Sequence, residues 1–156
     1  MSFILQLTQK ETLLLQDLKA QEQLCIEKYK KYAAQACDEQ LKTLFHTIMQ
    51  AEQTHLDTVS AMLSGTVPMM TGGAQQGQQG GGQIQPTTCP AEQKQQDAYL
   101  CQDALGMEKH VSTTYNTAIF EFRDAQARDA LNHIQKEEQQ HGKRIYDYMA
   151  ANGMSA

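Results

Sequence analysis

Apolar residues recur at alternating steps of three and four along four segments of the chain. The first two stripes are Leu15, Leu18, Glu22, Cys25, Tyr29, Tyr32, Ala36 and Leu41, Phe45, Ile48, Glu52, His55, Val59, Met62. The other two are Cys101, Ala104, Glu108, Val111, Tyr115, Ala118, Phe122 and Ala127, Leu131, Ile134, Glu138, His141, Ile145, Tyr148. Such spacing gives a helix one apolar face, as in helices that pack at a shallow angle in a bundle. The pattern predicts four long amphipathic helices.

Local signals predict where these helices begin and end. Starts are indicated by the capping box Thr8-Gln9-Lys10-Glu11, by Asp38 and Asp124 as N-caps, and by Pro90 near a first helical position. Glycines are favoured just after a helix, and Gly65 and Gly153 stand there. The sequence therefore predicts helical hairpins over residues 8–64 and 90–152.

The stretch between the hairpins, residues 65–89, has a different composition. It holds seven glycines and no charged residue, so we expect a flexible Gly/Gln-rich linker. About 25 residues can span the roughly 40 Å length of a 27-residue helix. We therefore expect residues 1–156 to form a single all-α domain, a four-helix bundle whose long crossover makes the second and third helices parallel.

The two hairpins are related by an internal duplication with an offset of 86 residues. This offset places Glu22 on Glu108, Glu52 on Glu138 and His55 on His141, and it also aligns Leu14 with Leu100 and Tyr29 with Tyr115. A repeat of this kind indicates two copies of one structural unit.

The polar residues in the stripes share one level of the bundle. Glu22 and Glu52 each lie fifteen residues from Cys37, and Glu108 and Glu138 lie fifteen residues from Arg123. At about 1.5 Å per residue, each pair reaches a level roughly 22 Å from its turn. A histidine three residues after a glutamate lies on the same helix face. We expect one layer with four carboxylates and two imidazoles.

Such a layer favours a metal site. Burial of even one uncompensated carboxylate costs several kcal/mol, and the stripes contain no Lys or Arg. Two divalent cations would balance four carboxylates, and an oxygen-rich site with one imidazole per metal suits iron or manganese. The candidate ligands are Glu22, Glu52, His55, Glu108, Glu138 and His141. The alternative is that these side chains only hydrogen-bond to one another or to water.

A glutamate followed by E-x-x-H in each hairpin is the ligand pattern of the ferritin-like di-iron/di-manganese proteins. More closely, "LLLQDLKAQEQLCIEKYKKYAAQACDEQLKTLFHTIMQAEQTHLDTV" and "EKHVSTTYNTAIFEFRDAQARDALNHIQKEEQQHGKRIYDYMAANG" resemble the two halves of the spore coat protein F family. The resemblance implies a role in sporulation. The ferritin-like pattern implies that Glu22 and Glu108 are terminal ligands, that Glu52 and Glu138 bridge two metals, and that His55 and His141 each bind one. The pattern lacks the fifth helix of ferritin cages and the four-cysteine iron site of full-length rubrerythrins.

Composition narrows the partners and the location. A net charge of -5 argues against nucleic acid or an anionic membrane as a partner. No apolar run reaches the roughly 18 residues of a membrane span, and the first residues do not resemble a signal peptide. We expect a cytoplasmic protein, and the resemblance to the spore coat protein F family implies that it is deposited in the spore coat. The four cysteines lack C-x-x-C spacing, so we expect small buried hydrophobes in a reducing compartment.

Several residues near the layer have two interpretations. Tyr29 and Tyr115 are expected to be core tyrosines with satisfied hydroxyls, the alternative being a role next to the metals. Cys25 and Cys101 are expected to be buried hydrophobes, and the less favoured alternative is that their thiols bind a metal. Residues expected to be solvated are His46, His110 and His133, and Glu27 and Glu137 are expected on an ordinary charged face.

Three functions are compatible with these observations. The first is a di-metal protein with oxygen, peroxide or ferrous-iron redox chemistry, and the second is a structural protein of the spore coat in which metals only hold the bundle together. The third is a metal-free coat bundle. Partners would be metal ions and other spore coat proteins, and the sequence leaves open a homo-oligomer.

Overall fold

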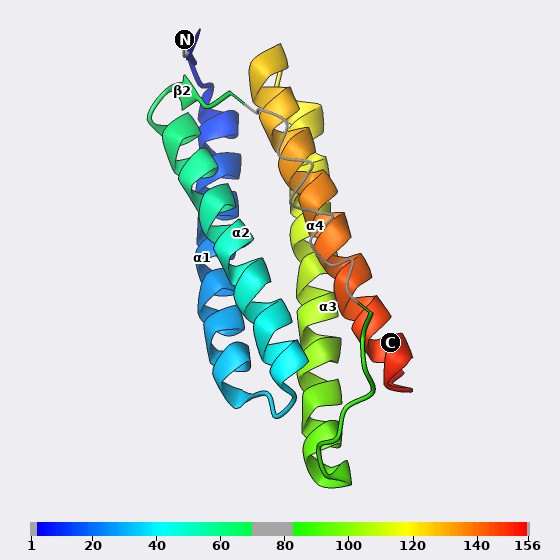
Figure 1. Ribbon diagram of the computed structural model, residues 1–156. Coiled ribbons are helices and arrows are strands. Elements are labelled where there is room, and N and C mark those ends of the chain that lie inside the picture. The colour runs from blue at the N-terminus through cyan, green and yellow to red at the C-terminus, as the bar shows by residue number, and fades with distance from the viewer. Residues whose placement is uncertain (1–2, 70–82, 156) are drawn as a thin grey trace.

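The computed structural model describes residues 3–69 and 83–155 and contains the four expected helices (Figure 1). The element order is β1 (Phe3–Ile4), α1 (Gln9–Gln35), α2 (Glu39–Leu63), β2 (Thr66–Val67), α3 (Ala91–Glu121) and α4 (Ala125–Ala151). The prediction of an all-α four-helix bundle is confirmed.

The helix ends follow the local signals in the sequence. The Thr8 hydroxyl accepts a hydrogen bond from the Glu11 backbone N–H at 3.1 Å, and the Glu11 carboxylate accepts one from the Thr8 N–H at 2.9 Å. Asp38 and Asp124 are the N-caps of α2 and α4. Gly65 and Gly153 follow their helices with φ angles of 94° and 66°, in the left-handed region that glycine tolerates best.

The long connection makes α2 and α3 parallel, as predicted, whereas consecutive helices of an up-and-down bundle are antiparallel. The carboxylate of Asp97, near the start of α3, accepts hydrogen bonds from the backbone N–H groups of Cys37 and Asp38 in the α1–α2 turn. At the other end of the bundle, Lys10 near the start of α1 forms an ion pair with Glu121 at the end of α3. The helices α2 and α3 therefore start at the same end and run parallel (Figure 1).

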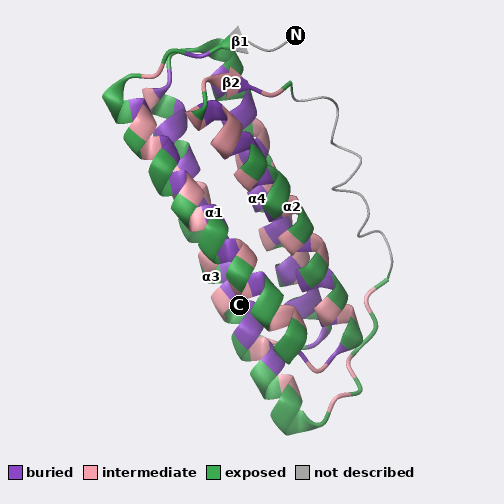
Figure 2. Cartoon of the chain, turned by 90° about the vertical axis from the view of Figure 1, so that its left-hand side faces the viewer, coloured by how far each residue is buried: buried purple, intermediate pink, exposed green. Residues whose placement is uncertain are grey.

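The four stripes form the core. Every stripe residue is buried except Tyr32, which is half-buried and packs against the core. Figure 2 shows the buried positions along all four helices, with exposed positions on the outer faces. Burying one Leu or Phe contributes about 1.5–3 kcal/mol, so the stripes supply the main force that holds the hairpins together. Within the described residues, no helix is long and apolar enough to cross a membrane.

The start of the linker is ordered in a way that the sequence did not predict. Thr66 and Val67 pair antiparallel with Ile4 and Phe3. The Leu5 N–H also donates to the carbonyl of Gly65 at 2.6 Å. Two-residue strands are too short to show an alternating pattern. The linker was predicted to be flexible over residues 65–89, of which residues 70–82 lie outside the described residues.

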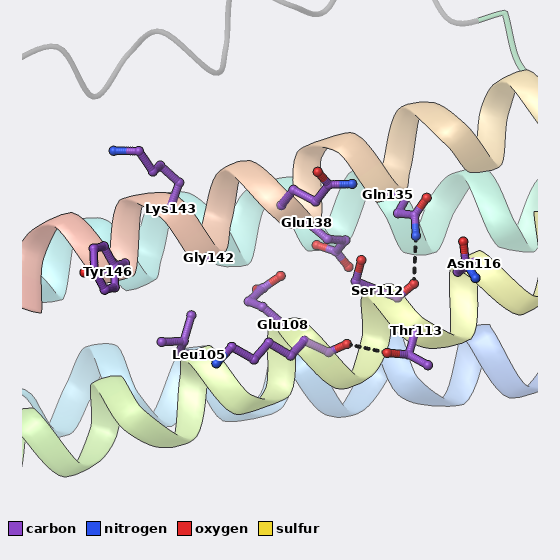
Figure 3. A pocket seen from close by; sticks show the side chains of 12 residues that line it. Leu105, Glu108, Ser112, Thr113, Asn116, Gln135, Glu138, Gly142, Lys143 and Tyr146 are labelled. Carbon is purple, nitrogen blue, oxygen red and sulfur yellow. Dashed lines mark hydrogen bonds between the residues drawn. The ribbon is translucent and has the colours of Figure 1, made fainter. Parts of the chain in front are cut away.

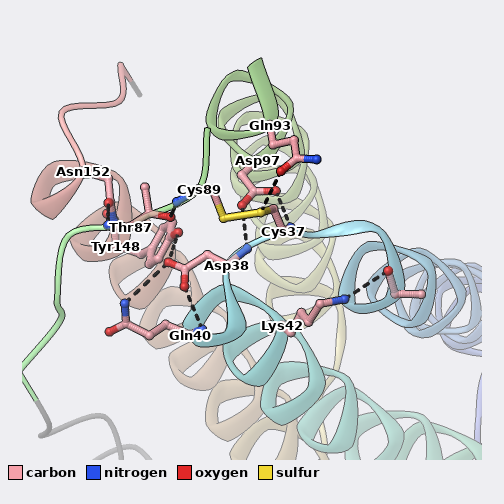
Figure 4. Close-up of a disulfide and its surroundings, with 11 residues drawn as sticks. Cys37, Asp38, Gln40, Lys42, Thr87, Cys89, Gln93, Asp97, Tyr148 and Asn152 are labelled. Carbon is pink, nitrogen blue, oxygen red and sulfur yellow. Dashed lines mark hydrogen bonds between the residues drawn. A yellow bond between two sulfur atoms is a disulfide. The ribbon is translucent and has the colours of Figure 1, made fainter. Parts of the chain in front are cut away.

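The end of the linker is fixed to the α1–α2 turn by a disulfide between Cys37 and Cys89 (Figure 4). Nearby, the Thr87 N–H donates to the side-chain oxygen of Asn152, and Gln85 exchanges two hydrogen bonds with Gln40. The expectation of four reduced cysteines was wrong for this pair. The crossover brings together two cysteines 52 residues apart, a distance at which sequence spacing carries no signal. Cys25 and Cys101 are free and buried, as expected.

Reduction of this disulfide is expected to destabilise the bundle. Cross-linking residues 52 apart removes loop entropy from the unfolded chain, with a typical effect of about 2–4 kcal/mol on the free energy of unfolding. Urea titration with and without reductant measures the difference. The Cys37→Ser/Cys89→Ser double variant is the control, and its unfolding midpoint should be the same in both conditions. If the reductant leaves the unfolding midpoint of the native chain unchanged, the disulfide does not stabilise the bundle as predicted.

Candidate metal centre

The six predicted ligands lie together in the middle of the bundle. The exposed fraction is 0% for Glu22 and Glu52, 1% for His55 and Glu138, 3% for Glu108 and 6% for His141. One carboxylate comes from each helix, and α2 and α4 each add one imidazole. The level predicted from counting residues outward from the two turns is therefore correct.

The side chains form two overlapping clusters of potential ligands. The first is Glu22, Glu52, His55 and Glu138, and the second is Glu52, Glu108, Glu138 and His141. Within each cluster, one ligand atom per residue lies within 4.8 Å of all the others. Glu52 and Glu138 belong to both clusters, whereas neither cluster includes Cys25 or Cys101. This is the geometry that two metals with two shared carboxylates require, although metal binding itself stays a prediction.

Both imidazoles present the same nitrogen to the carboxylates. Nδ1 of His55 lies 2.7 Å from Oε1 of Glu52, and Nδ1 of His141 lies 3.1 Å from Oε1 of Glu138. The carboxylates of Glu22 and Glu138 lie 3.7 and 3.6 Å from His55 Nδ1. The imidazole rings are stacked with their centroids 5.8 Å apart. The two halves of the centre thus repeat each other, as the duplication implies.

Each glutamate keeps one oxygen free for a further ligand. Among the described residues, one buried oxygen of each of these side chains has no hydrogen-bond partner: Glu22 Oε1, Glu52 Oε2, Glu108 Oε1 and Glu138 Oε2. A buried polar atom without a partner costs about 1–3 kcal/mol, more when the group is charged. Four such oxygens in one layer fit a pair of hard or borderline cations.

Each hairpin has a tyrosine that donates a hydrogen bond to a glutamate of the other hairpin. The Tyr29 hydroxyl of the first hairpin donates to Glu108 at 2.5 Å, and the Tyr115 hydroxyl of the second hairpin donates to Glu22 at 2.6 Å. Both tyrosines are completely buried. They are core tyrosines with satisfied hydroxyls, as expected, and their partners are the candidate ligands themselves.

Glu137 is a residue near the centre that sequence reasoning placed wrongly. Its carboxylate lies 2.7 Å from Nε2 of His55, on the opposite side of the imidazole from Glu52. Its other oxygen lies 3.3 Å from His133, which is half-buried rather than solvated. The equivalent position in the first hairpin is Ala51, so His141 has no matching glutamate there. The sequence offered one sign of this contact: a glutamate precedes Glu138 in the second hairpin, whereas Ala51 precedes Glu52 in the first. His46 and His110 are exposed, as expected.

Without metal, protons balance the charges of the layer. Burial raises the pKa of Glu22 to about 8, and the charge of Glu52 adds to this effect. Burial and the charges of Glu52 and Glu108 also raise the pKa of Glu138 well above its usual value. Burial opposes ionisation of Glu52 too, but contacts with His141 and His55 outweigh burial and hold its pKa well below the usual value. Carboxylates at similar depth therefore take different protonation states.

The imidazoles carry the matching positive charge. Burial alone would lower the pKa of His55, but hydrogen bonds to Glu137 and Glu52 outweigh it and raise the pKa to about 10. Contacts of His141 with Glu108 and Glu52 likewise overcome burial and raise its pKa to about 9. Metal ligation needs neutral imidazole and ionised carboxylate, so metal binding at this centre would release protons.

Comparison with known proteins supports the resemblance for the second hairpin. Residues 96–156 match the family model of the Coat F domain, a region that includes Glu108, Glu138 and His141 and is less than half of the chain. The expected resemblance to the spore coat protein F family is thereby confirmed over these residues. The likeness of the first hairpin and the ferritin-like assignment stay predictions. No curated protein and no solved structure matches the chain.

The metal-free protein should lose stability as pH rises from 6 to 9. Glu22, His55 and His141 have raised pKa values in the folded state, so the folded protein binds more protons than the unfolded one. Their contribution is complete below the unfolded pKa and disappears as pH passes the folded values of about 8, 10 and 9. Glu52 has the opposite sign, but its contribution is lost only below about pH 4.5. Thermal melts of chelator-treated protein test this, and a melting temperature that rises over the same range would refute it.

Replacing Glu137 by Gln should act on one histidine and spare the other. The variant removes the carboxylate that contributes most to the raised pKa of His55, so that pKa should fall, while His141 should change much less. NMR titration of the imidazole protons in metal-free protein measures both. Glu27→Gln, which removes an exposed carboxylate paired with Lys31, is the matched control. Equal shifts of the two histidines would show that Glu137 does not act through its contact with His55.

Proposed function

We propose that this chain is a di-metal carboxylate protein that binds two divalent cations, iron or manganese, one in each cluster. Glu22 and Glu108 would be terminal ligands, Glu52 and Glu138 would be shared by both metals, and His55 and His141 would bind one metal each. The observation that carries the proposal is the convergence of these six buried side chains from four helices into two overlapping ligand sets.

The charges of the layer support two cations rather than one. Four ionised carboxylates carry four negative charges, which two divalent ions neutralise when both imidazoles are neutral. Lysine and arginine are absent from all four stripes, so within this core the alternatives are protons or metal. Carboxylate oxygens with one imidazole per metal suit iron and manganese better than zinc or copper.

When bound, such a pair would supply redox chemistry toward oxygen, peroxide or ferrous iron. The residues of the chain would position the pair and limit the water around it. Tyr29 and Tyr115 hold the terminal carboxylates in place, and Glu137 fixes the ring of His55 through Nε2. Buried hydrogen bonds of this kind keep ligands in their binding orientation.

A second candidate function is supported by the Coat F domain match, which associates the second hairpin with the spore coat. In this role the bundle would contact other coat proteins, alone or as an oligomer, and the metals would only hold its four helices together. Both functions use the same six side chains. Consumption of peroxide or ferrous iron by the metal-loaded protein favours the first, and unchanged substrate with full metal content favours the second.

We predict two metals per chain and a different loss for each kind of glutamate. Glu52→Ala removes a ligand common to both clusters and should abolish binding of both metals, whereas Glu22→Ala should weaken one site. Elemental analysis after equilibrium dialysis against Mn²⁺ or anaerobic Fe²⁺ gives the stoichiometry.

The exposed Glu27→Ala is the control and should keep both metals. Two tightly bound metals in the Glu52→Ala variant would refute the shared role of Glu52. No bound metal in the native chain would favour the metal-free coat bundle instead.

A further inference from the structure

A groove of about 660 Å³ lies between α3 and α4 and reaches the centre (Figure 3). Glu108 and Glu138 form part of its lining, although these side chains are only 3% and 1% exposed. The oxygens without hydrogen-bond partners include Glu108 Oε1 and Glu138 Oε2, on the same two side chains. The groove therefore borders two carboxylates that the proposed metals would need.

A glycine of α4, Gly142, is one of the residues that line the groove. A Cβ atom added to Gly142 would lie 3.6 Å from the Leu105 side chain of α3, so larger side chains at this position would occupy the space. Glycine inside a helix costs about 1 kcal/mol relative to alanine. At the far end, Gln135 of α4 donates a hydrogen bond to the carbonyl of Ser112 in α3 at 3.0 Å, which ties the two helices together beside the opening.

The first hairpin has larger apolar residues at the positions equivalent to Gly142 and Ser112, and an apolar residue at the position equivalent to Gln135. The offset of 86 residues places Leu56 where α4 has Gly142, Ile26 where α3 has Ser112, and Met49 where α4 has Gln135. All three apolar side chains are partly buried. The duplicated ligands are thus the same in the two hairpins, while the residues that cover them differ.

The lining favours a small uncharged molecule with hydrogen-bonding groups. It offers hydroxyl and amide groups from Ser112, Thr113, Asn116 and Gln139. Lys109 and Lys143 also line it, and the Lys143 ammonium is paired with Asp147 at 2.7 Å. With Lys143 paired and the two carboxylates buried, apolar, hydroxyl and amide groups make up most of the lining, which suits a small neutral molecule.

We infer that this groove is the entrance through which a small neutral oxygen species of the size of hydrogen peroxide reaches the metal pair. The role rests on the proposed function, but the access route itself is a property of the chain. Among the described residues, the second hairpin carries this groove, whereas partly buried apolar side chains stand at three equivalent positions of the first hairpin.

Cysteine labelling of metal-free protein tests the route without any metal. Glu108→Cys places a thiol at the end of the groove, and Glu22→Cys places one at the duplicated position in the other hairpin. Iodoacetamide should label the first faster by more than about tenfold, because labelling Glu22→Cys needs local opening, and every 1.4 kcal/mol of opening slows it tenfold. Tandem mass spectrometry, which locates the label within a peptide, separates these thiols from Cys25 and Cys101, which lie in the same tryptic peptides.

Gly142→Leu should close the groove and slow labelling of Glu108→Cys. The matched control is Gly106→Leu, which also replaces an interior helix glycine but has no atom within 4 Å of an added Cβ. Both changes improve helix propensity, so only the first should slow labelling. Equal labelling of the Glu108→Cys and Glu22→Cys thiols, or no effect of Gly142→Leu, would overturn the route.

Nitric oxide tests access to the loaded centre, because it is small and neutral and its binding to ferrous iron is visible in the absorption spectrum. In Fe²⁺-loaded protein, Gly142→Leu should slow nitric oxide binding severalfold and leave the iron content unchanged, while Gly106→Leu should change neither. Binding at an unchanged rate would overturn the entrance role. Failure of the native chain to take up iron would instead count against the proposed function, and the labelling result would still decide the route.

Discussion

Four carboxylates meet at one level of the bundle interior, and their mutual repulsion must be balanced wherever they are buried. The core offers no lysine or arginine at this level, so protons or metal ions must supply the positive charge. In the metal-free chain, protons on the two imidazoles and on Glu22 do so. The hydrophobic stripes bring the helices together. Whether the bundle is stable also depends on the neutralisation of these buried carboxylates by protons or metal ions.

The duplicated sequence gives the centre near-twofold symmetry, and a few residues break it. The tyrosines Tyr29 and Tyr115 preserve the symmetry, because each donates to the glutamate of the opposite hairpin. Glu137 breaks it, since the matching position is Ala51 and only His55 gains a carboxylate on Nε2. Gly142, which lines the groove, breaks it again, since the matching position is Leu56. A centre with similar candidate ligands in both halves thus has different surroundings in each half.

The sequence predicted what depends on helical periodicity and on distance from the turns. The stripes placed the core, and equal counts from Cys37 and Arg123 placed Glu22, Glu52, Glu108 and Glu138 at one level. Contacts between distant segments were not predictable in this way. The Cys37–Cys89 bond and the pairing of β1 with β2 depend on how the crossover runs. The contact of Glu137 with His55 depends on how α4 is rotated about its axis relative to α2. The position of Glu137 outside the apolar stripe does not reveal this rotation.

The most direct test of the central claim is a crystal structure of the metal-loaded chain with anomalous scattering data at the manganese or iron edge. We expect two anomalous peaks per chain, one among Glu22, Glu52, His55 and Glu138, and one among Glu52, Glu108, Glu138 and His141. A loaded crystal without a peak at this level, or with its only peaks at exposed carboxylates, would contradict the account.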